Sequence, residues 1–255
     1  MSAIVSRLCR YPVKGLSTES LGSVTLEPDQ GIAGDRRYAL ALSSTTFDPA
    51  NPQWMPKTNF LMLMRHERLA ALETRFDEGT GVLTVLRDGK AVTRGDLRTP
   101  VGRGMVEEFF AAYMGSQVAG KPKVVAATGD HMFSDHSNRV VSIINLATVR
   151  DLERVVRSDV DPLRFRANVY VDEAPAWSEF DWVDRDITIG DARLHVTARI
   201  DRCAATNVRP GAGTRDMNLP RTLQQVFGHV DCGVYARVES GGTVSVGDRL
   251  VAEDI

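Results

Sequence analysis

Apolar and polar residues alternate in several short stretches of the chain, and turn-forming residues follow most of them. Ala3–Tyr11 ("AIVSRLCRY") is strand-like, and Gly22–Glu27 ("GSVTLE") alternates before the turn residues of "PDQGIAGDRR". A period of two is typical of strands with one buried face. Similar patterns predict strands over Arg37–Leu42 and Val124–Ala127, with a polar loop over Ser43–Lys57 between them.

Two dipeptides mark tight turns between alternating runs. Asp88-Gly89 lies in "GVLTVLRDGKAVTRG" and Gly190-Asp191 in "ITIGDARLHVTARI", and each predicts a β-hairpin. "RFRANVYVDE" is strand-like after Arg166. The final "GVYARVESGGTVSVGDRLVAEDI" predicts two or three short strands joined by glycine turns, which is typical of a barrel or a meander.

Two segments have helical spacing instead. Met105–Met114 and Asn145–Val156 carry apolar residues every three or four positions, and Asn145 is placed to cap the second helix. Strands outnumber helices and rarely alternate with them, which favours a β-dominated α+β fold. The polar segment Thr128–Asn138 separates the two groups of elements, so we expect an N-terminal β-rich domain over residues 1–127 and a second domain over 128–255.

The composition narrows the class of protein. The formal net charge is -2, so no global basic field points to nucleic acid, and no apolar run reaches the length of a membrane span. The first residues lack the apolar core of a signal peptide. Three cysteines without CxxC spacing argue against a disulfide framework and a zinc site, and they favour a reducing compartment, so we expect a cytoplasmic protein. No GxSxG, HExxH, Walker A or dinucleotide-binding motif is present.

Cys203 has the most unusual setting of the three cysteines. It follows an alternating stretch, opens a loop of Thr, Asn, Pro and Gly, and has Arg202 beside it. A neighbouring positive charge stabilises a thiolate. Cys203 is therefore either a small buried side chain or a reactive or metal-ligating thiolate. Cys9 and Cys232 lie inside strand-like runs and are expected in the core.

Several cationic side chains stand at loop edges. Taken singly, such residues are most often solvated surface charges, but if they converge they form a pocket for an anion such as a phosphate. Gly31 and Gly34 would let the backbone approach that ligand. The cationic residues are Lys14, Arg36, Arg164, Arg166, Arg202 and Arg209.

One further polar cluster has two interpretations. His131 and His136 share a loop with Asp130 and Asp135, which resembles a loose metal-binding patch. Their spacing does not match a helical pair of ligands, and no cysteine is near. A solvated polar loop is the simpler interpretation.

These motifs together resemble a known family. "YPVKG" (11–15) and "GIAGDRRYAL" (31–40) resemble the N-terminal β-barrel domain of MOSC proteins. "FRANVYVD" (165–172), "DRCAATNVRPGAGTRD" (201–216), "FGHVDCGVYARV" (227–238) and "GGTVSVGD" (241–248) resemble the molybdenum cofactor sulfurase C-terminal (MOSC) domain itself. The arrangement is similar to the mitochondrial amidoxime-reducing component and its bacterial relatives. The resemblance implies a MOSC-type β-barrel with flanking helices, plus an N-terminal β-rich lobe.

The resemblance also implies a molybdenum–molybdopterin cofactor and residues that hold it. Cys203 matches the cysteine that ligates molybdenum, and Lys14 and Arg36 match residues near the pterin phosphate. Arg166, Asn168 and Arg202 match further cofactor-binding positions. The family's common "DPxTG" after the cysteine reads "RPGAG" here, so basic Arg209 replaces an acidic loop residue.

The function implied is that of a molybdenum-dependent oxidoreductase acting on a small molecule. It would reduce N-hydroxylated compounds such as amidoximes, hydroxylamines and N-hydroxylated bases. The chain shows no iron–sulfur, flavin or nicotinamide motif, so we expect electrons from a separate ferredoxin-, flavoprotein- or cytochrome-type protein. An alternative is a sulfur (persulfide) or molybdenum-cofactor carrier that uses the same Cys203, and a third is an interaction domain without a cofactor.

Overall fold

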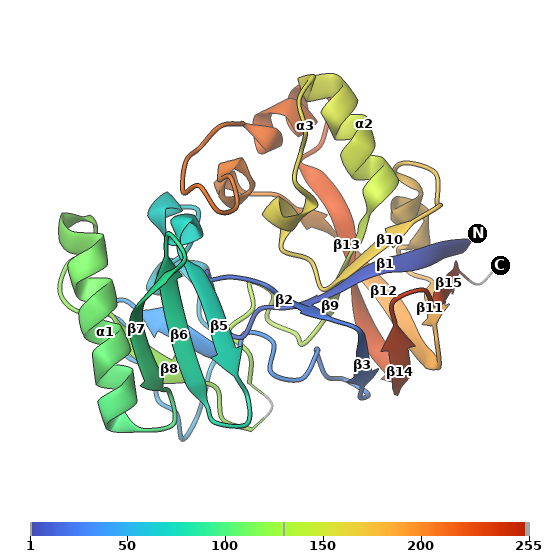
Figure 1. Cartoon of the computed structure of the whole chain (residues 1–255). Helices are drawn as coiled ribbons and strands as arrows, with labels where there is room; N and C mark the ends of the chain where they lie inside the picture. Colours follow the sequence, from blue (N-terminus) through green and yellow to red (C-terminus); the bar gives the residue numbers. More distant parts are fainter. Residues whose placement is uncertain (1, 130, 253–255) are drawn as a thin grey trace.

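The structure is a computed structural model that describes residues 2–129 and 131–252, and it consists of two lobes side by side (Figure 1). The larger lobe is a closed seven-stranded barrel in the order β10-β9-β13-β12-β11-β15-β1, with β1 pairing back to β10. The fold is α+β and dominated by strands, as predicted. The barrel strands are β1 (Ser2–Arg10), β9 (Val141–Asn145), β10 (Val169–Asp172), β11 (Asp186–Ile189), β12 (Ala192–Asp201), β13 (Asp231–Ser240) and β15 (Arg249–Ala252).

The first strand of the chain closes this barrel. On one side β1 is antiparallel to β10, with Leu8 opposite Val169, and on the other it is antiparallel to β15, with Ser2 opposite Val251. The short strand β2 (Glu19–Leu21) continues the sheet beyond β1. The range 1–127 thus contributes a strand to the barrel, while the division at residue 128 stays a prediction.

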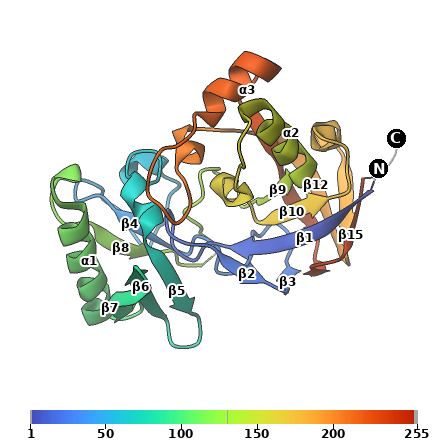
Figure 2. The same cartoon turned by 45° about the horizontal axis from the view of Figure 1, so that its top comes forward.

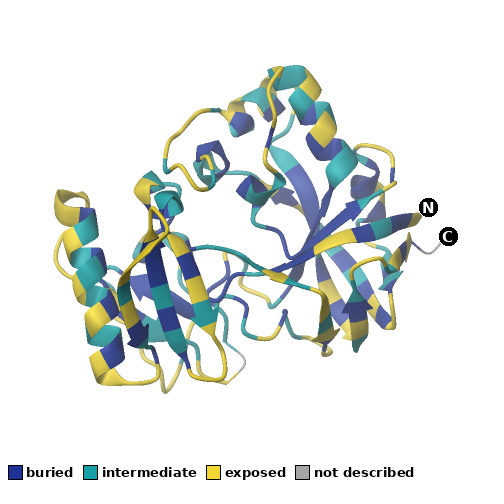
Figure 3. Cartoon of the chain, in the orientation of Figure 1, coloured by how far each residue is buried: buried dark blue, intermediate teal, exposed yellow. Residues whose placement is uncertain are grey.

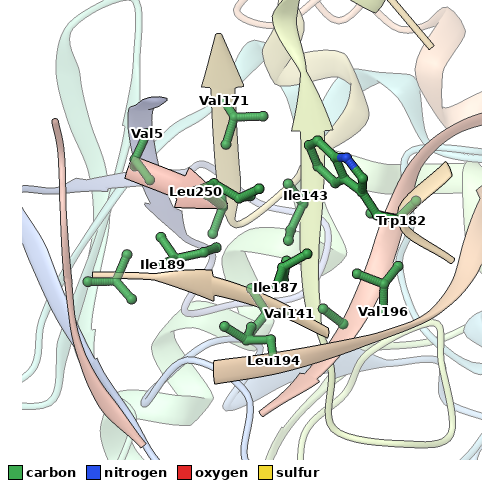
Figure 4. Close-up of a cluster of buried hydrophobic side chains, with 14 of the residues drawn as sticks. Val5, Val141, Ile143, Val171, Trp182, Ile187, Ile189, Leu194, Val196 and Leu250 are labelled. Atoms are coloured by element: carbon green, nitrogen blue, oxygen red, sulfur yellow. The ribbon is translucent and has the colours of Figure 1, made fainter. Parts of the chain in front are cut away.

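Alternating side chains fill the barrel (Figure 4). Along β12, Ala192, Leu194 and Val196 are buried while the residues between them are more exposed. They meet Trp182, which is 1% exposed, and Val171 from β10 in one apolar cluster. Removing this apolar surface from water is the main force that holds the barrel closed.

The second lobe is built on a meander and one helix. The strands β5 (Glu73–Asp77), β6 (Val82–Arg87) and β7 (Lys90–Asp96) form an antiparallel sheet. At the predicted hairpin turn, Asp88 and Gly89 have φ of 51° and 74°, the left-handed conformation that a tight two-residue turn requires. The remaining strands pair in two ribbons: β4 (Tyr38–Ala41) with β8 (Lys123–Ala126), and β3 (Ser23–Leu26) with β14 (Gly242–Ser245).

The helix α1 (Pro100–Met114) covers this meander and buries one face, as Figure 3 shows. Val106, Phe110 and Met114 lie on that face and pack into the core of the lobe. The side chain of Thr99 accepts a hydrogen bond from the backbone N–H of Gly102 and caps the helix.

Two glycines of α1 are expected to respond oppositely to alanine. A Cβ on Gly102 would lie 2.2 Å from the carbonyl oxygen of Asp96, whereas a Cβ on Gly104 would meet nothing within 4 Å. Gly102→Ala should lower the free energy of unfolding by about 1–3 kcal/mol through overpacking. Gly104→Ala should raise it by about 1 kcal/mol, because alanine favours helix. Urea unfolding checks both, and shifts of the same sign would contradict the packing described.

Two helices cover one end of the barrel (Figure 2). They are α2 (Leu146–Val156), which connects the parallel strands β9 and β10, and α3 (Leu219–Phe227). The predicted cap of α2 is confirmed, since the Asn145 side chain accepts a hydrogen bond from the N–H of Ala147 at 3.0 Å. The sequence patterns did not predict α3. No helix among residues 2–129 and 131–252 has the length and apolar character that a membrane crossing needs.

Candidate functional site

A polar cavity of about 300 Å³ lies where residues of the two lobes meet. Its wall includes all six residues that the family resemblance implies for the cofactor, although they span nearly two hundred positions of the chain. Such a volume is at the lower end of the range for small-molecule sites. The six residues are Lys14, Arg36, Arg166, Asn168, Arg202 and Cys203.

Backbone hydrogen bonds fix the loops that carry two of these cations. The N–H of Lys14 donates to the carbonyl of Tyr38 at 2.8 Å, and the N–H of Arg36 donates to the carbonyl of Tyr11 at 2.7 Å. Arg36 has a φ of 48° and Arg166 a φ of 52°, so both stand at tight left-handed turns. Positive φ is uncommon for arginine, and at ligand-binding sites such strain serves to aim a side chain.

The two guanidinium groups lie over one aromatic ring. Arg36 is 4.9 Å and Arg166 is 4.3 Å from the centroid of Tyr11, within the range of cation–π attraction. Arg36 is paired with Asp35, and its guanidinium also donates to the carbonyl of Arg166 at 3.0 Å. Burial opposes the charge of Arg36, but the Asp35 carboxylate raises its pKa above the ordinary value.

Arg166 lacks such a carboxylate. Its Nη1 donates to the carbonyl of Leu16 at 2.7 Å, while its Nη2 is buried without a hydrogen-bond partner in the described structure. Burial is the main cause that lowers the pKa of this guanidinium. A buried cation with an unpaired N–H is costly in isolation, and a bound anion would remove that cost.

Asn168 lines the cavity with an amide that is already bonded. Its Oδ1 accepts from the N–H and the hydroxyl of Ser142 at 3.2 and 2.8 Å. Its Nδ2 donates to the carbonyl of Cys9 at 3.3 Å and to Asp35 at 3.1 Å. The side chain therefore ties together β9, β1 and the loop that carries Arg36, and it positions the wall of the cavity.

An ionic network that the sequence did not reveal borders the thiol. Lys14, only 6% exposed, donates to the carbonyl of Phe133 at 2.9 Å and pairs with Asp135. The other oxygen of Asp135 is 3.6 Å from Nζ of Lys57, which is another cation of the cavity wall. Lys57 is in hydrogen-bonding reach of the Cys203 thiol. Although burial opposes it, the pKa of Lys57 is raised by Asp135 and Cys203.

Asp135→Asn is expected to change how stability depends on pH. Burial opposes the ionised form, yet the Lys14 and Lys57 ammonium groups lower the pKa of Asp135 from 3.8 to about 2. The ionised carboxylate therefore stabilises the folded protein above about pH 4, and this contribution is lost as the pH falls towards 2. Melting temperatures of wild type and variant should converge over that interval.

Asp88→Asn is the matched control for this measurement. Asp88 is in an exposed hairpin turn, where asparagine also adopts positive φ, and the charge change is the same. Its melting curve should run parallel to that of the wild type in acid. A constant gap between wild type and Asp135→Asn from about pH 4 to 2 would contradict the network.

Cys203 opens a 3₁₀ turn, Ala204–Asn207, at the end of β12. Its carbonyl accepts from the N–H and the hydroxyl of Thr206 at 3.1 and 3.0 Å. These bonds fix the backbone while the half-buried thiol borders the cavity. Cys9 and Cys232 are fully buried as predicted, and burial raises the pKa of Cys232 to about 12.

The guanidinium of Arg202 is engaged by backbone carbonyls. It donates through Nε to the carbonyl of Cys232 at 2.7 Å and through Nη1 to that of Phe165 at 3.0 Å. Its predicted effect on the neighbouring thiol stays a prediction, and Lys57 is the cation within hydrogen-bonding reach of that thiol. Arg202 still lines the cavity and ties β13 to the turn before β10.

The remaining candidates differ in position. Arg164 also lines the cavity and pairs with Asp216 at 2.7 Å, whereas Arg209 is exposed and is not in the cavity wall. Gly31 and Gly34, expected near the anion, are not in the wall of this cavity.

The histidine loop forms no metal site in the part of the chain that is described. His131 packs edge-on against Phe133, and His136 accepts from the N–H of Asn138 at 3.0 Å. No group of three or more His, Cys, Asp or Glu side chains there could hold a metal ion. Asp130 lies outside the described residues.

Comparison with known proteins supplies the family. The model of the MOSC domain matches residues 128–251. This part of the chain is a MOSC domain. The match covers β9 to β15 and includes Arg166, Arg202 and Cys203. The family is associated with the molybdenum cofactor. No curated protein sequence matches the chain.

Three solved structures are similar in part. The YUAD protein from Bacillus subtilis is 13% identical over 98% of this chain and 94% of that chain, with a TM-score of 0.45. YiiM from Geobacillus stearothermophilus is 18% identical, with a TM-score of 0.36, and YiiM from Escherichia coli is 20% identical, with a TM-score of 0.32. Each YiiM match covers 45% of this chain and 54% of the other.

Proposed function

We propose that this MOSC-domain protein is a molybdenum-cofactor-dependent reductase of N-hydroxylated compounds. The observation that carries the proposal is the convergence of six cations and one thiol on a single cavity. The wall contains Cys203 together with Lys14, Arg36, Lys57, Arg164, Arg166 and Arg202. A net charge of -2 for the whole chain makes this local concentration of positive charge distinctive.

The residues present fit a molybdenum–molybdopterin cofactor. The unpaired Nη2 of Arg166 can donate a hydrogen bond to a phosphate oxygen of the cofactor. The nearby guanidinium of Arg36 adds a second planar group of donors. The thiol of Cys203 is a soft sulfur ligand of the kind that molybdenum accepts. When bound, the cofactor supplies two-electron reduction with removal of the oxygen of the N–OH group.

The chain's own residues bind and orient the cofactor and supply positive charge beside it. Lys57 holds its proton at Nζ beside Cys203, and its positive charge there is maintained by Asp135. Lys14 pairs with the other oxygen of the same carboxylate. The overall reaction consumes two electrons and two protons and yields the reduced nitrogen compound and water. The electrons come from a separate ferredoxin-, flavoprotein- or cytochrome-type protein in the cytoplasm.

The test is anaerobic turnover by protein that carries its metal. The protein is produced in a host that makes molybdopterin, its molybdenum content is measured, and benzamidoxime is added with a reduced viologen dye as electron donor. We expect benzamidine to form in proportion to the molybdenum content. Fully loaded protein that reduces neither benzamidoxime nor hydroxylamine would overturn the proposal. A sulfur adduct on Cys203 without metal, seen by mass spectrometry, would instead support a sulfur carrier.

A further inference from the structure

A second cavity, here called the side chamber, adjoins the site and has different chemistry. It encloses about 440 Å³ between the meander lobe and the loop that follows Cys203. Leucine and valine side chains from both lobes dominate its wall, and its two carboxylates, Glu73 and Asp88, are exposed. These leucine and valine side chains are Leu16, Leu63, Leu69, Leu72, Leu86, Leu163 and Val208.

The side chamber shares part of its wall with the cavity that contains Cys203. Gly15 and Ala205 are among the residues common to both, and so is Leu63. Gly15 has a φ of 81°, and a Cβ there would lie 3.0 Å from the carbonyl oxygen of Leu61. The two cavities are therefore neighbours, and the wall that they share has small residues at Gly15 and Ala205.

The polar groups at the shared wall are guanidinium groups. Arg164 and Arg166 line both cavities, and Nε of Arg164 and Nη2 of Arg166 are buried without a hydrogen-bond partner in the described structure. Because Nη2 of Arg166 is assigned to the cofactor phosphate, Nε of Arg164 is the unpaired N–H that remains for a substrate, and it favours an oxygen-bearing, neutral or anionic head over a cation. The apolar remainder of the chamber suits a flat aryl or branched alkyl body.

We infer that the side chamber holds the apolar body of the substrate, so that its N–OH group lies at the shared wall beside Arg164 and faces the cavity that contains Cys203. The inference rests on the proposed function and adds a substrate class, namely N-hydroxylated compounds with an aryl or branched alkyl group. It also assigns a role to the wall arginines after reaction. An amidine is a stronger base than the amidoxime from which it forms, so the protonated product is repelled by them.

Ala70→Phe fills the chamber without touching the Cys203 cavity. Ala70 is half-buried on the turn Glu67–Ala71. It lines the side chamber but not the cavity that contains Cys203. We expect the KM for benzamidoxime to rise about tenfold or more, because an aryl group loses its apolar site. The KM for hydroxylamine, which has no apolar body, should stay unchanged. Ala112→Phe on the exposed side of α1 is the matched control and should change neither constant.

A binding measurement separates this inference from the proposed reaction. Fluorine NMR follows 4-fluorobenzamidoxime added to the oxidised, molybdenum-loaded protein, where no turnover occurs. Wild type and Ala112→Phe should bind the probe, and Ala70→Phe should bind it about tenfold more weakly. Leu163→Ala, which shortens a half-buried wall residue, is a second variant if the phenylalanine prevents folding, and it should also weaken binding.

The outcomes are distinguishable. Unchanged probe binding and unchanged KM in folded Ala70→Phe and Leu163→Ala would overturn the side-chamber inference and leave the proposed function standing. Loss of molybdenum from Ala70→Phe would place part of the cofactor in the chamber and would also overturn the inference. Probe binding that depends on Ala70 in a protein without any turnover would support the chamber as a ligand site and overturn the proposed reaction.

Discussion

Cys203→Ala is expected to leave a folded protein that has lost its molybdenum. The backbone of Cys203 is held through its carbonyl by Thr206, and its side chain is not part of an apolar core, so the variant should melt close to the wild type. Replacing residues that merely support a metal ligand typically costs 10–100-fold in affinity, so loss of the ligand itself should cost at least about 100-fold. Metal content measured by mass spectrometry and benzamidoxime reduction should fall together.

Cys9→Ala is the control for this variant. Cys9 is also a free cysteine, but its side chain is buried in an apolar cluster and is not in the wall of the cavity. It should keep the wild-type molybdenum content and lose about 1 kcal/mol of stability through the small void left by the sulfur. Equal molybdenum in Cys203→Ala and in wild type, with cofactor supply confirmed, would exclude Cys203 as a ligand.

Arg166→Met is expected to weaken cofactor binding without weakening the cofactor-free fold. The guanidinium is buried with no carboxylate ion pair in the described structure, so an apolar side chain of similar length removes an uncompensated charge, which offsets the lost hydrogen bond from Nη1 to the carbonyl of Leu16. The free energy of unfolding should stay within about 1 kcal/mol of the wild type or rise. Loss of a charge-assisted hydrogen bond should lower cofactor affinity about 10–100-fold. Urea unfolding and molybdenum content measure the two effects separately.

Arg164→Met supplies the contrast. The Arg164 side chain is 2% exposed and pairs with Asp216 at 2.7 Å, and it also donates to the carbonyls of Thr206 and Asn207. Its removal leaves these acceptors unpaired and should cost about 2–4 kcal/mol of stability. If Arg166→Met destabilised the cofactor-free protein as strongly, the unpaired guanidinium would have a structural role and not a binding one.

Local patterns predicted those elements whose cause is local. The hairpin at Asp88-Gly89 follows from two residues that accept positive φ, and the start of α2 follows from the Asn145 cap. The helix Leu219–Phe227 was missed, although Asn218 caps it in the same way, because it is short and follows an irregular loop. The closure of the barrel by β1 depends on partners far along the chain, and no local pattern contains that information.

The site was predicted in part. The cationic positions and Cys203 were identified, but adjacency in sequence did not show that backbone carbonyls engage the guanidinium of Arg202. Cys203 has extended backbone dihedrals, and in extended backbone neighbouring side chains point to opposite sides, so Arg202 reaches the carbonyl of Cys232. Asp135 was named only as part of a possible metal-binding patch and Lys57 was missed, because no local motif marks either residue and only the tertiary fold brings them together at the cavity.

The position of β1 in the barrel has a consequence for synthesis of the chain. Along the chain β1 precedes its partner β10 by most of the smaller lobe, and β15 follows later still. Until β10 has been made, β1 can pair only with the short strand β2, and a chain that lacks β15 leaves both β1 and β11 with open edges that invite pairing with other chains. Closure of the barrel therefore depends on contacts between distant segments, and chains that lack β15 are expected to be the species most prone to aggregation.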